Sequence, residues 1–294
     1  MLIKRLMAAV YLVSQLSSVS LAAETDLATA IAVGFLGESG GDRLFYFPTK
    51  DAASTPAKYG YRYQDVTFTA SDGIKLHGWW IPAKKKSAKA TVVYSHGNAG
   101  SLPHHFVFVY WLVDAGYNVM MYDYRGYGKS GGEISKEGIV EDAKAAYLYT
   151  SERPDVDGII SMGHSLGGAK SIAALAELAP KDLKAVVVDS TFASYRDMAE
   201  RVAGPRARKV VSDTFEPYVY IKKLPENTPF LVVHGSDDST IPFAQAEKLF
   251  TAANQPKKLM WVDGGDHVNC FFVDDGKYRA QLLRWMDQAL TPND

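Results

Sequence analysis

The chain has 294 residues, of which 47% are hydrophobic and 22% are charged, and its formal net charge is −1. This composition is typical of a globular protein with a large core, and the balanced charge does not favour nucleic acid or an anionic membrane surface as a partner. The one cysteine, Cys270, excludes an internal disulfide framework and a zinc cluster built on cysteines. We interpret Cys270 as a small buried residue rather than a nucleophile.

Residues 1–23 are predicted to be an export signal. Two basic residues precede the apolar run 6–13, and Ser-Leu-Ala at 20–22 fits the small-x-small cleavage rule better than Leu-Ala-Ala at 21–23. Polar residues between 14 and 18 interrupt the apolar run, which makes it a poor transmembrane helix. The sequence therefore predicts a periplasmic or secreted protein, and an uncleaved membrane anchor is the alternative.

Residues 24–60 are interpreted as an N-terminal arm and residues 61–294 as the main domain. Within that domain, residues 61–82 contain two alternating segments separated by the turn Ser71-Asp72-Gly73. Alternation on both sides of such a turn predicts a β-hairpin.

From residue 90 onward, strand-like and helix-like patterns alternate. The strand-like runs are 90–95, 118–123, 158–163, 184–189, 229–234 and 257–262. The helix-like runs are about 103–115, 136–150, 167–179, 192–203, 242–253 and 277–290. A hairpin followed by strand–helix–strand units predicts an α/β fold with a mainly parallel central sheet and helices on both faces.

The stretch Gly163-His164-Ser165-Leu166-Gly167 ends a strand-like run and begins a helix of small residues. This G-x-S-x-G pattern between a strand and a helix places a serine hydroxyl at the tip of a sharp turn. A Cβ at either glycine would collide with the neighbouring strand or helix, and the first amides of the helix point to where an oxyanion would form. The pattern predicts Ser165 as a nucleophile, and the alternative is that it only caps the helix.

A serine nucleophile needs a histidine base and an acid that orients the base, and in this kind of fold the acid precedes the histidine in the chain. The loop after the last strand ends in His267, which we predict to be the base. The loop after the preceding strand holds Asp237 and Asp238, and the spacing His-Gly-x-x-Asp-x-x-Ile-Pro selects Asp238 as the acid. Asp237 is interpreted as a turn residue, and Asp266 is a weaker candidate for the acid.

The remaining histidines are interpreted as structural. We expect His77 to lie in the hairpin, His96 and His234 to brace loops, His104 and His105 to lie at the surface or in a groove, and His164 to point away from the serine. Because no two histidines are four residues apart on one helix face, we expect no metal site, and the predicted chemistry requires no cofactor.

Two backbone amides are needed to stabilise an oxyanion. We predict that Leu166, directly after the serine, supplies one of them. The loop Ser95-His96-Gly97-Asn98-Ala99-Gly100 is predicted to supply the other, with Asn98 as the first choice and Ala99 as the second. The glycines of this loop let its backbone approach a substrate carbonyl.

Several of these segments together resemble the α/β-hydrolase superfamily, and within it the serine-aminopeptidase-like and depalmitoylase-like branch. The segments are Ser95–Gly100, Tyr122–Gly132 (Tyr-Asp-Tyr-Arg-Gly-Tyr-Gly-Lys-Ser-Gly-Gly), Gly163–Gly168, His234–Pro242 and Gly264–His267. The resemblance spans about residues 45–290 and implies an α/β-hydrolase fold with an N-terminal β-hairpin. In the second segment we interpret Arg125 as the partner of a buried acid; contact with an anionic substrate group is the alternative.

Many relatives carry a large cap domain, but the segment 191–227 of this chain has only the size of one or two helices. We therefore expect a small lid or no cap. Apolar side chains of this segment either line one wall of an acyl groove or pack the lid on the sheet. They are Phe192, Tyr195, Met198, Val202, Phe215, Tyr218 and Tyr220.

Together these features predict an exported serine hydrolase that cleaves carboxylic esters or thioesters through Ser165, His267 and Asp238 and an acyl-enzyme intermediate. The expected substrate is a small-molecule or lipid-like acyl ester; no nucleic acid is expected as a partner, and contact with a membrane is not indicated. One alternative is a serine aminopeptidase or amidase, which would need an acidic group to hold a substrate ammonium. The other is a non-catalytic binding protein on a hydrolase fold.

Overall fold

The computed structural model describes residues 40–50 and 54–291, so the predicted export signal lies outside the described residues. The described residues divide into two units. A small unit consists of residues 40–45 and Tyr195–Thr214, and a large unit contains the rest. In the part of the chain that is described, no helix has the length and apolar character needed to cross a membrane.

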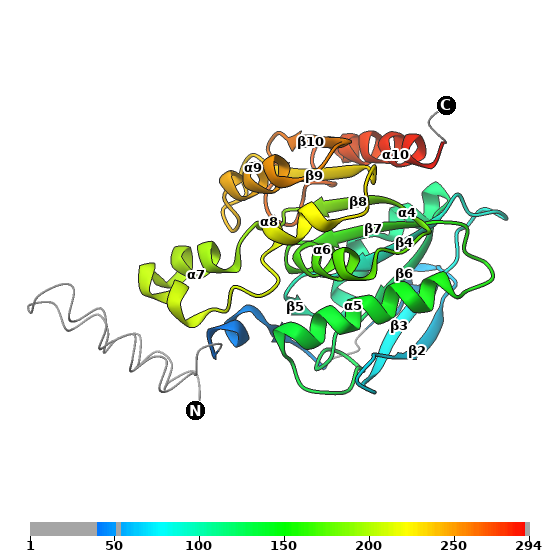
Figure 1. Ribbon diagram of the computed structural model, residues 1–294. Helices are drawn as coiled ribbons and strands as arrows, with labels where there is room; N and C mark the ends of the chain where they lie inside the picture. The colour runs from blue at the N-terminus through cyan, green and yellow to red at the C-terminus, as the bar shows by residue number, and fades with distance from the viewer. Residues whose placement is uncertain (1–39, 51–53, 292–294) are drawn as a thin grey trace, which may run out of the picture. The chain divides into compact units, whose positions relative to one another are not determined.

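The large unit is built on one eight-stranded sheet (Figure 1). In chain order its strands are β2 (Gln64–Thr69), β3 (Lys75–Ile81), β4 (Thr91–Ser95), β6 (Asn118–Tyr122), β7 (Ile159–His164), β8 (Leu183–Asp189), β9 (Phe230–Gly235) and β10 (Lys257–Val262). They lie in the order β10-β9-β8-β7-β4-β6-β3-β2, and only the β2–β3 and β3–β6 pairs are antiparallel. The predicted hairpin and the predicted mainly parallel sheet are both confirmed.

Helices cover both faces of this sheet, as predicted. Ile160 and Met162 of β7 belong to an apolar cluster that includes residues of α4 (Tyr110–Ala115) and α10 (Lys277–Leu290). The residue between them, Ser161, points the other way because side chains alternate along a strand, and its Oγ lies 2.6 Å from Tyr147 Oη of α5 (Lys136–Ser151). Helix α6 (Leu166–Leu178) packs against α5 on this second face (Figure 1).

Most predicted helices are observed within a few residues of their expected ends, but the helix expected over 103–115 is broken. Its place is taken by α3 (Leu102–His105), the 3₁₀ turn η3 (Phe106–Phe108) and α4. Between them Val109 has φ −130° and ψ −13°, outside the helical range, and its side chain is fully buried. The four consecutive aromatic and β-branched residues at 106–109 fit one stripe of a regular helix poorly, which accounts for the break.

A two-stranded parallel ladder, which was not predicted, joins β1 (Phe47–Pro48) to β5 (Ala99–Gly100). Each strand is two residues long, and proline and glycine are poor strand residues. The pairing depends on residues about fifty positions apart, so no local pattern could reveal it. It ties the chain before the hairpin to the loop that follows β4.

The remaining elements of the large unit are short except for α9 (Phe243–Ala252). They are η2 (Pro56–Tyr59), α8 (Pro217–Tyr220), η5 (Ile221–Lys223) and η6 (Asp274–Gly276). The small unit contains η1 (Gly40–Phe45), α7 (Tyr195–Ala203) and η4 (Pro205–Val210). Within it, the Ser212 hydroxyl donates to the Asp42 carboxylate at 2.7 Å.

Candidate active site

Ser165 lies on the sharp turn between β7 and α6. It has φ 52° and ψ −118°, a conformation that L-residues rarely adopt. A Cβ on Gly163 would lie 2.5 Å from the Gly168 Cα, and a Cβ on Gly167 would lie 2.0 Å from the Ser95 carbonyl oxygen. Both positions therefore need glycine because the backbone of a neighbouring segment approaches them closely, as predicted from the sequence.

The structure brings Ser165, His267 and Asp238 together into one hydrogen-bonded chain. Ser165 Oγ lies 3.1 Å from His267 Nε2, and His267 Nδ1 lies 3.0 Å from Asp238 Oδ2. The three residues come from loops at the carboxyl ends of β7, β10 and β9, which are aligned at one edge of the parallel sheet.

Asp238 is held as a carboxylate. Its side chain is only 1% exposed, and Oδ1 accepts hydrogen bonds from the amides of Thr240 at 3.0 Å and Ile241 at 2.8 Å. Burial raises the pKa of Asp238, but the hydrogen bond to His267 and the Ile241 amide outweigh it and hold the pKa below its ordinary value. The group is therefore an anion against the Nδ1 side of the His267 ring at neutral pH.

The two alternative acids, Asp237 and Asp266, make their hydrogen bonds to groups other than the His267 ring. Asp237 is exposed and accepts a hydrogen bond from the Ser236 hydroxyl at 2.8 Å, as expected of a turn residue. Asp266 Oδ1 accepts the backbone amide of His267 at 2.6 Å, and the Asp266 amide donates to Asn269 Oδ1 at 2.6 Å. These bonds shape the loop that carries His267.

His164 belongs to a pair that was not predicted. Its Nδ1 lies 3.1 Å from Asp189 Oδ2, and the two residues are register partners at the ends of β7 and β8. The His164 ring centroid is 5.1 Å from that of His267 and 5.7 Å from that of Phe108, on which it stacks. The strand register was the only signal of the pair, and it requires knowing that β7 and β8 are neighbours.

His105 also differs from its expected place at the surface or in a groove. It is 7% exposed, and its Nε2 donates to the Ala99 carbonyl oxygen at 2.7 Å. His96 and His234 brace loops as predicted, because His96 Nδ1 lies 2.7 Å from the Gly97 oxygen and His234 Nε2 lies 2.9 Å from the Ile241 oxygen.

Two further predictions about side chains are confirmed. Cys270 is buried, and burial raises the pKa of its thiol well above the ordinary value, which keeps it protonated. Arg125 pairs with a buried acid: its Nε donates to Asp142 Oδ1 at 2.9 Å, and its Nη1 donates to Asp72 Oδ2 at 2.6 Å. The guanidinium thus joins the hairpin turn to α5.

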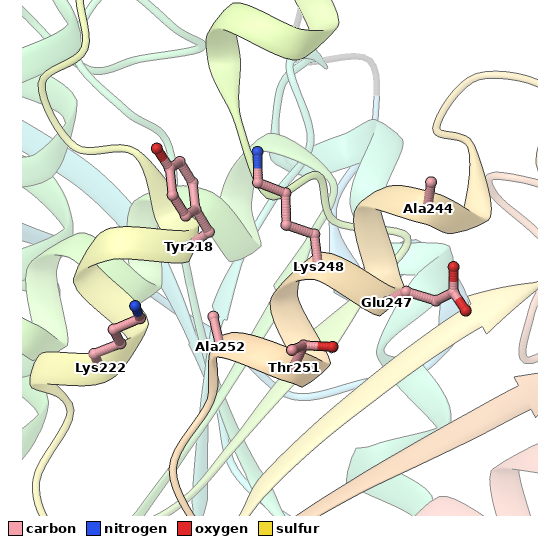
Figure 2. Close-up of a pocket in the computed structure, with 7 residues that line it drawn as sticks. All are labelled: Tyr218, Lys222, Ala244, Glu247, Lys248, Thr251 and Ala252. Atoms are coloured by element: carbon pink, nitrogen blue, oxygen red, sulfur yellow. The ribbon is translucent and has the colours of Figure 1, made fainter.

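A cavity of about 650 Å³ lies between α8–η5 and α9 (Figure 2). It is lined by Tyr218, Lys222, Ala244, Glu247, Lys248, Thr251 and Ala252. Lys248 Nζ lies 4.2 Å from the centroid of the Tyr218 ring. None of the three residues of the hydrogen-bonded chain lines this cavity, so the cavity is not part of the Ser165 site.

The chain is similar to known proteins over most of its length. The alpha/beta hydrolase domain-containing protein WAV2 of Arabidopsis thaliana is 31% identical over 270 residues, which cover 84% of this chain and 87% of that protein. The chain belongs to the α/β-hydrolase superfamily. The uncharacterized protein YfhR of Escherichia coli (strain K12) is 34% identical over 255 residues, which cover 85% of this α/β hydrolase and 88% of YfhR. The family model described as serine aminopeptidase, S33, matches residues 86–227.

Solved structures show the same fold. The Pyrococcus furiosus esterase Pf2001 matches with a TM-score of 0.70 at 22% identity, covering 84% of this α/β hydrolase and 99% of the esterase. Est1E of Butyrivibrio proteoclasticus, solved with ferulic acid bound, matches with a TM-score of 0.60 at 19% identity, covering 76% of this chain and 97% of Est1E. The predicted α/β-hydrolase fold is confirmed, and the protein is a hydrolase of this type.

Proposed function

We propose that this α/β hydrolase is a serine hydrolase that cleaves carboxylic esters or thioesters through an acyl-enzyme intermediate. The observation that carries the proposal is the pair of hydrogen bonds at His267, 3.1 Å to Ser165 Oγ and 3.0 Å to Asp238 Oδ2. A nucleophile, a base and an orienting acid within hydrogen-bond distance are the parts that acyl transfer needs.

In the proposed reaction Ser165 Oγ attacks the substrate carbonyl while His267 Nε2 accepts the hydroxyl proton. Asp238 holds the Nδ1 proton of His267 and stabilises the imidazolium that forms. The amides of Leu166 and Asn98 donate to the oxyanion of the tetrahedral intermediate. The bond to the leaving oxygen or sulfur then breaks, the leaving group takes the proton from Nε2, and water repeats the sequence on the acyl-enzyme.

The arrangement of acids favours esters over aminopeptidase substrates. An aminopeptidase would need a carboxylate near Ser165 to bind a substrate ammonium. Asp238 is engaged by His267, Asp189 by His164, and Asp266 by the His267 amide. The esterases among the structural neighbours agree with this choice, whereas the family model described as serine aminopeptidase keeps the peptidase as the second candidate.

A fluorophosphonate probe tests the proposed nucleophile directly. We expect one covalent adduct per chain, located by peptide mass spectrometry on Ser165, because only a serine paired with a general base reacts rapidly with this electrophile. We also expect turnover of a p-nitrophenyl ester series from acetyl to palmitoyl, recorded at 405 nm. Labelling without ester turnover, combined with cleavage of aminoacyl p-nitroanilides, would favour the peptidase. If the chain is not labelled, the esterase and the peptidase are both excluded, and the non-catalytic binding protein is the remaining candidate.

We also propose that the protein is exported, on the evidence of the charged start, the apolar run and the small residues at 20–22. Expressed as the full chain in a bacterial host, it should accumulate outside the cytoplasm with Ala23 or Glu24 as its first residue, as shown by intact mass and N-terminal sequencing. Leu12→Arg, which breaks the apolar run, should keep the precursor intact and inside the cell. Recovery of an uncleaved chain in the membrane fraction would contradict cleavage and favour an anchor.

A further inference from the structure

The loop that follows β4, residues 96–100, is held by its carbonyl oxygens. The His96 oxygen accepts a hydrogen bond from Tyr124 Oη at 2.7 Å, and the Asn98 oxygen accepts one from Tyr127 Oη at 2.7 Å. The Asn98 oxygen also accepts the Phe47 amide at 2.8 Å. The two hydroxyl donors come from one segment, Tyr-Arg-Gly-Tyr at the end of β6, which the proposed chemistry has not used.

Two neutral histidines hold other carbonyl oxygens of the same loop. His96 Nδ1 lies 2.7 Å from the Gly97 oxygen, and His105 Nε2 lies 2.7 Å from the Ala99 oxygen. Burial lowers the pKa of His96 well below its ordinary value and lowers the pKa of His105 to about 4. Both rings therefore stay neutral at physiological pH, with one N–H each to donate.

A held carbonyl oxygen fixes the direction of the next amide. In a trans peptide the C=O and the N–H point in opposite directions, so anchoring the oxygen on one side aims the hydrogen to the other. The Gly97–Asn98 peptide lies between the two carbonyl groups that Tyr124 and Tyr127 hold. Its own oxygen is held by the His96 ring. The His96 ring thus fixes the Asn98 amide through its own peptide group, and Tyr124 and Tyr127 hold the peptide groups on either side of it.

The loop also lies against the turn that carries the nucleophile. A Cβ built on Gly97 would be 3.2 Å from His164 Cδ2, and one built on Gly167 would be 2.5 Å from the His96 oxygen. The His96 oxygen is the one that Tyr124 holds. A small movement of the loop therefore changes the backbone directly beside Ser165.

We propose that Tyr124 and Tyr127 are positioning residues that aim the Asn98 amide at the oxyanion, an inference that rests on the proposed serine hydrolase function. Both side chains are fully buried, and their ring centroids lie 4.2 Å and 5.2 Å from that of His96. Phenylalanine keeps these ring contacts and removes only the hydroxyl. The Phe47 amide still holds the Asn98 oxygen in the Tyr127 variant, so the loop is loosened rather than released.

Tyr127→Phe is expected to lower kcat for p-nitrophenyl ester hydrolysis about 10-fold, with KM unchanged within about twofold, because complete loss of an oxyanion donor costs about 10²–10³ and a misaimed donor costs part of that. Tyr124→Phe should act in the same direction, and the double variant should lose more than either single one. The affinity for an alkyl trifluoromethyl ketone, whose hemiketal places an oxyanion in the same position, should fall in parallel with kcat/KM.

Tyr117→Phe is the matched control. Its buried hydroxyl donates to Asp287 at 2.5 Å. Tyr117 directly precedes β6, so it lies at the opposite end of that strand from the loop. This variant should lose stability without losing kcat or ketone affinity. Wild-type kcat and ketone affinity in both Tyr124→Phe and Tyr127→Phe, or a loss of kcat with ketone affinity retained, would overturn the positioning role. Absence of Ser165-dependent turnover in the wild type would instead overturn the proposed function.

Discussion

Replacing Ser165 with alanine is expected to lower kcat/KM for ester hydrolysis by about 10⁴- to 10⁶-fold. The variant keeps the His267–Asp238 pair but has no oxygen at the tip of the turn to attack the carbonyl. Water activated by His267 is the remaining nucleophile, and it is not held in the attacking position. The measurement is the initial rate on the best p-nitrophenyl ester at equal concentrations of folded protein, with the fold checked by circular dichroism.

Ser71→Ala serves as the control for this experiment. It also removes one serine hydroxyl, but from the exposed turn of the hairpin, where the hydroxyl donates to Glu141 at 2.6 Å. Its activity should equal that of the wild type. If Ser165→Ala retains more than about one tenth of the wild-type rate, Ser165 is not the nucleophile, because even the weakest loss expected of a serine triad is far larger.

The core of the fold could be predicted because its patterns are local. The inner strands of the parallel region are buried on both faces over most of their length and so read as short, mostly apolar runs, as in Ile159–Met162 and Ala185–Val188. The edge strand β10 has only one buried face. The hairpin follows from alternation around Ser71-Asp72-Gly73. The pattern failed at 106–109, where aromatic and β-branched side chains break the helix at Val109.

Some residues of the candidate site could likewise be predicted from the sequence, and others could not. Ser165, Asp238 and His267 could be picked because the motif, the spacing and the chain order are all present in the sequence. In the structure Ser165 and Asp238 each lie within hydrogen-bond distance of His267. The pair of His164 with Asp189 could not be picked, because it exists only once two strands are neighbours. The same is true of the Tyr124 and Tyr127 hydroxyls that hold the loop after β4, because only the tertiary fold brings them to its carbonyl oxygens. The two histidines that hold this loop act locally, since His96 contacts the oxygen of the next residue, Gly97, and His105 contacts that of Ala99.

Asp238→Asn is expected to lower kcat by about 10³- to 10⁴-fold while changing the structure little. The side chain stays the same size, and its oxygen can still accept the amides of Thr240 and Ile241 that Asp238 Oδ1 accepts. Its NH₂ group then faces His267 Nδ1 and donates to it, so the ring proton moves to Nε2. A protonated Nε2 cannot accept the Ser165 proton, and no anion remains to stabilise the imidazolium.

The neighbouring carboxylate provides a sharp control, because Asp237→Asn removes the same charge one residue away. Asp237 is exposed and contacts Ser236, so this variant should keep wild-type activity. The lowered pKa of Asp238 keeps it ionised throughout pH 5–9, so the wild type should lose activity through Asp238 protonation only below about pH 4, the ordinary range of aspartate. The deficit of Asp238→Asn should therefore be present across pH 5–9 when kcat is measured over that range. Equal losses in the two variants would show that the effect is one of charge at this loop and not of the ring proton on His267.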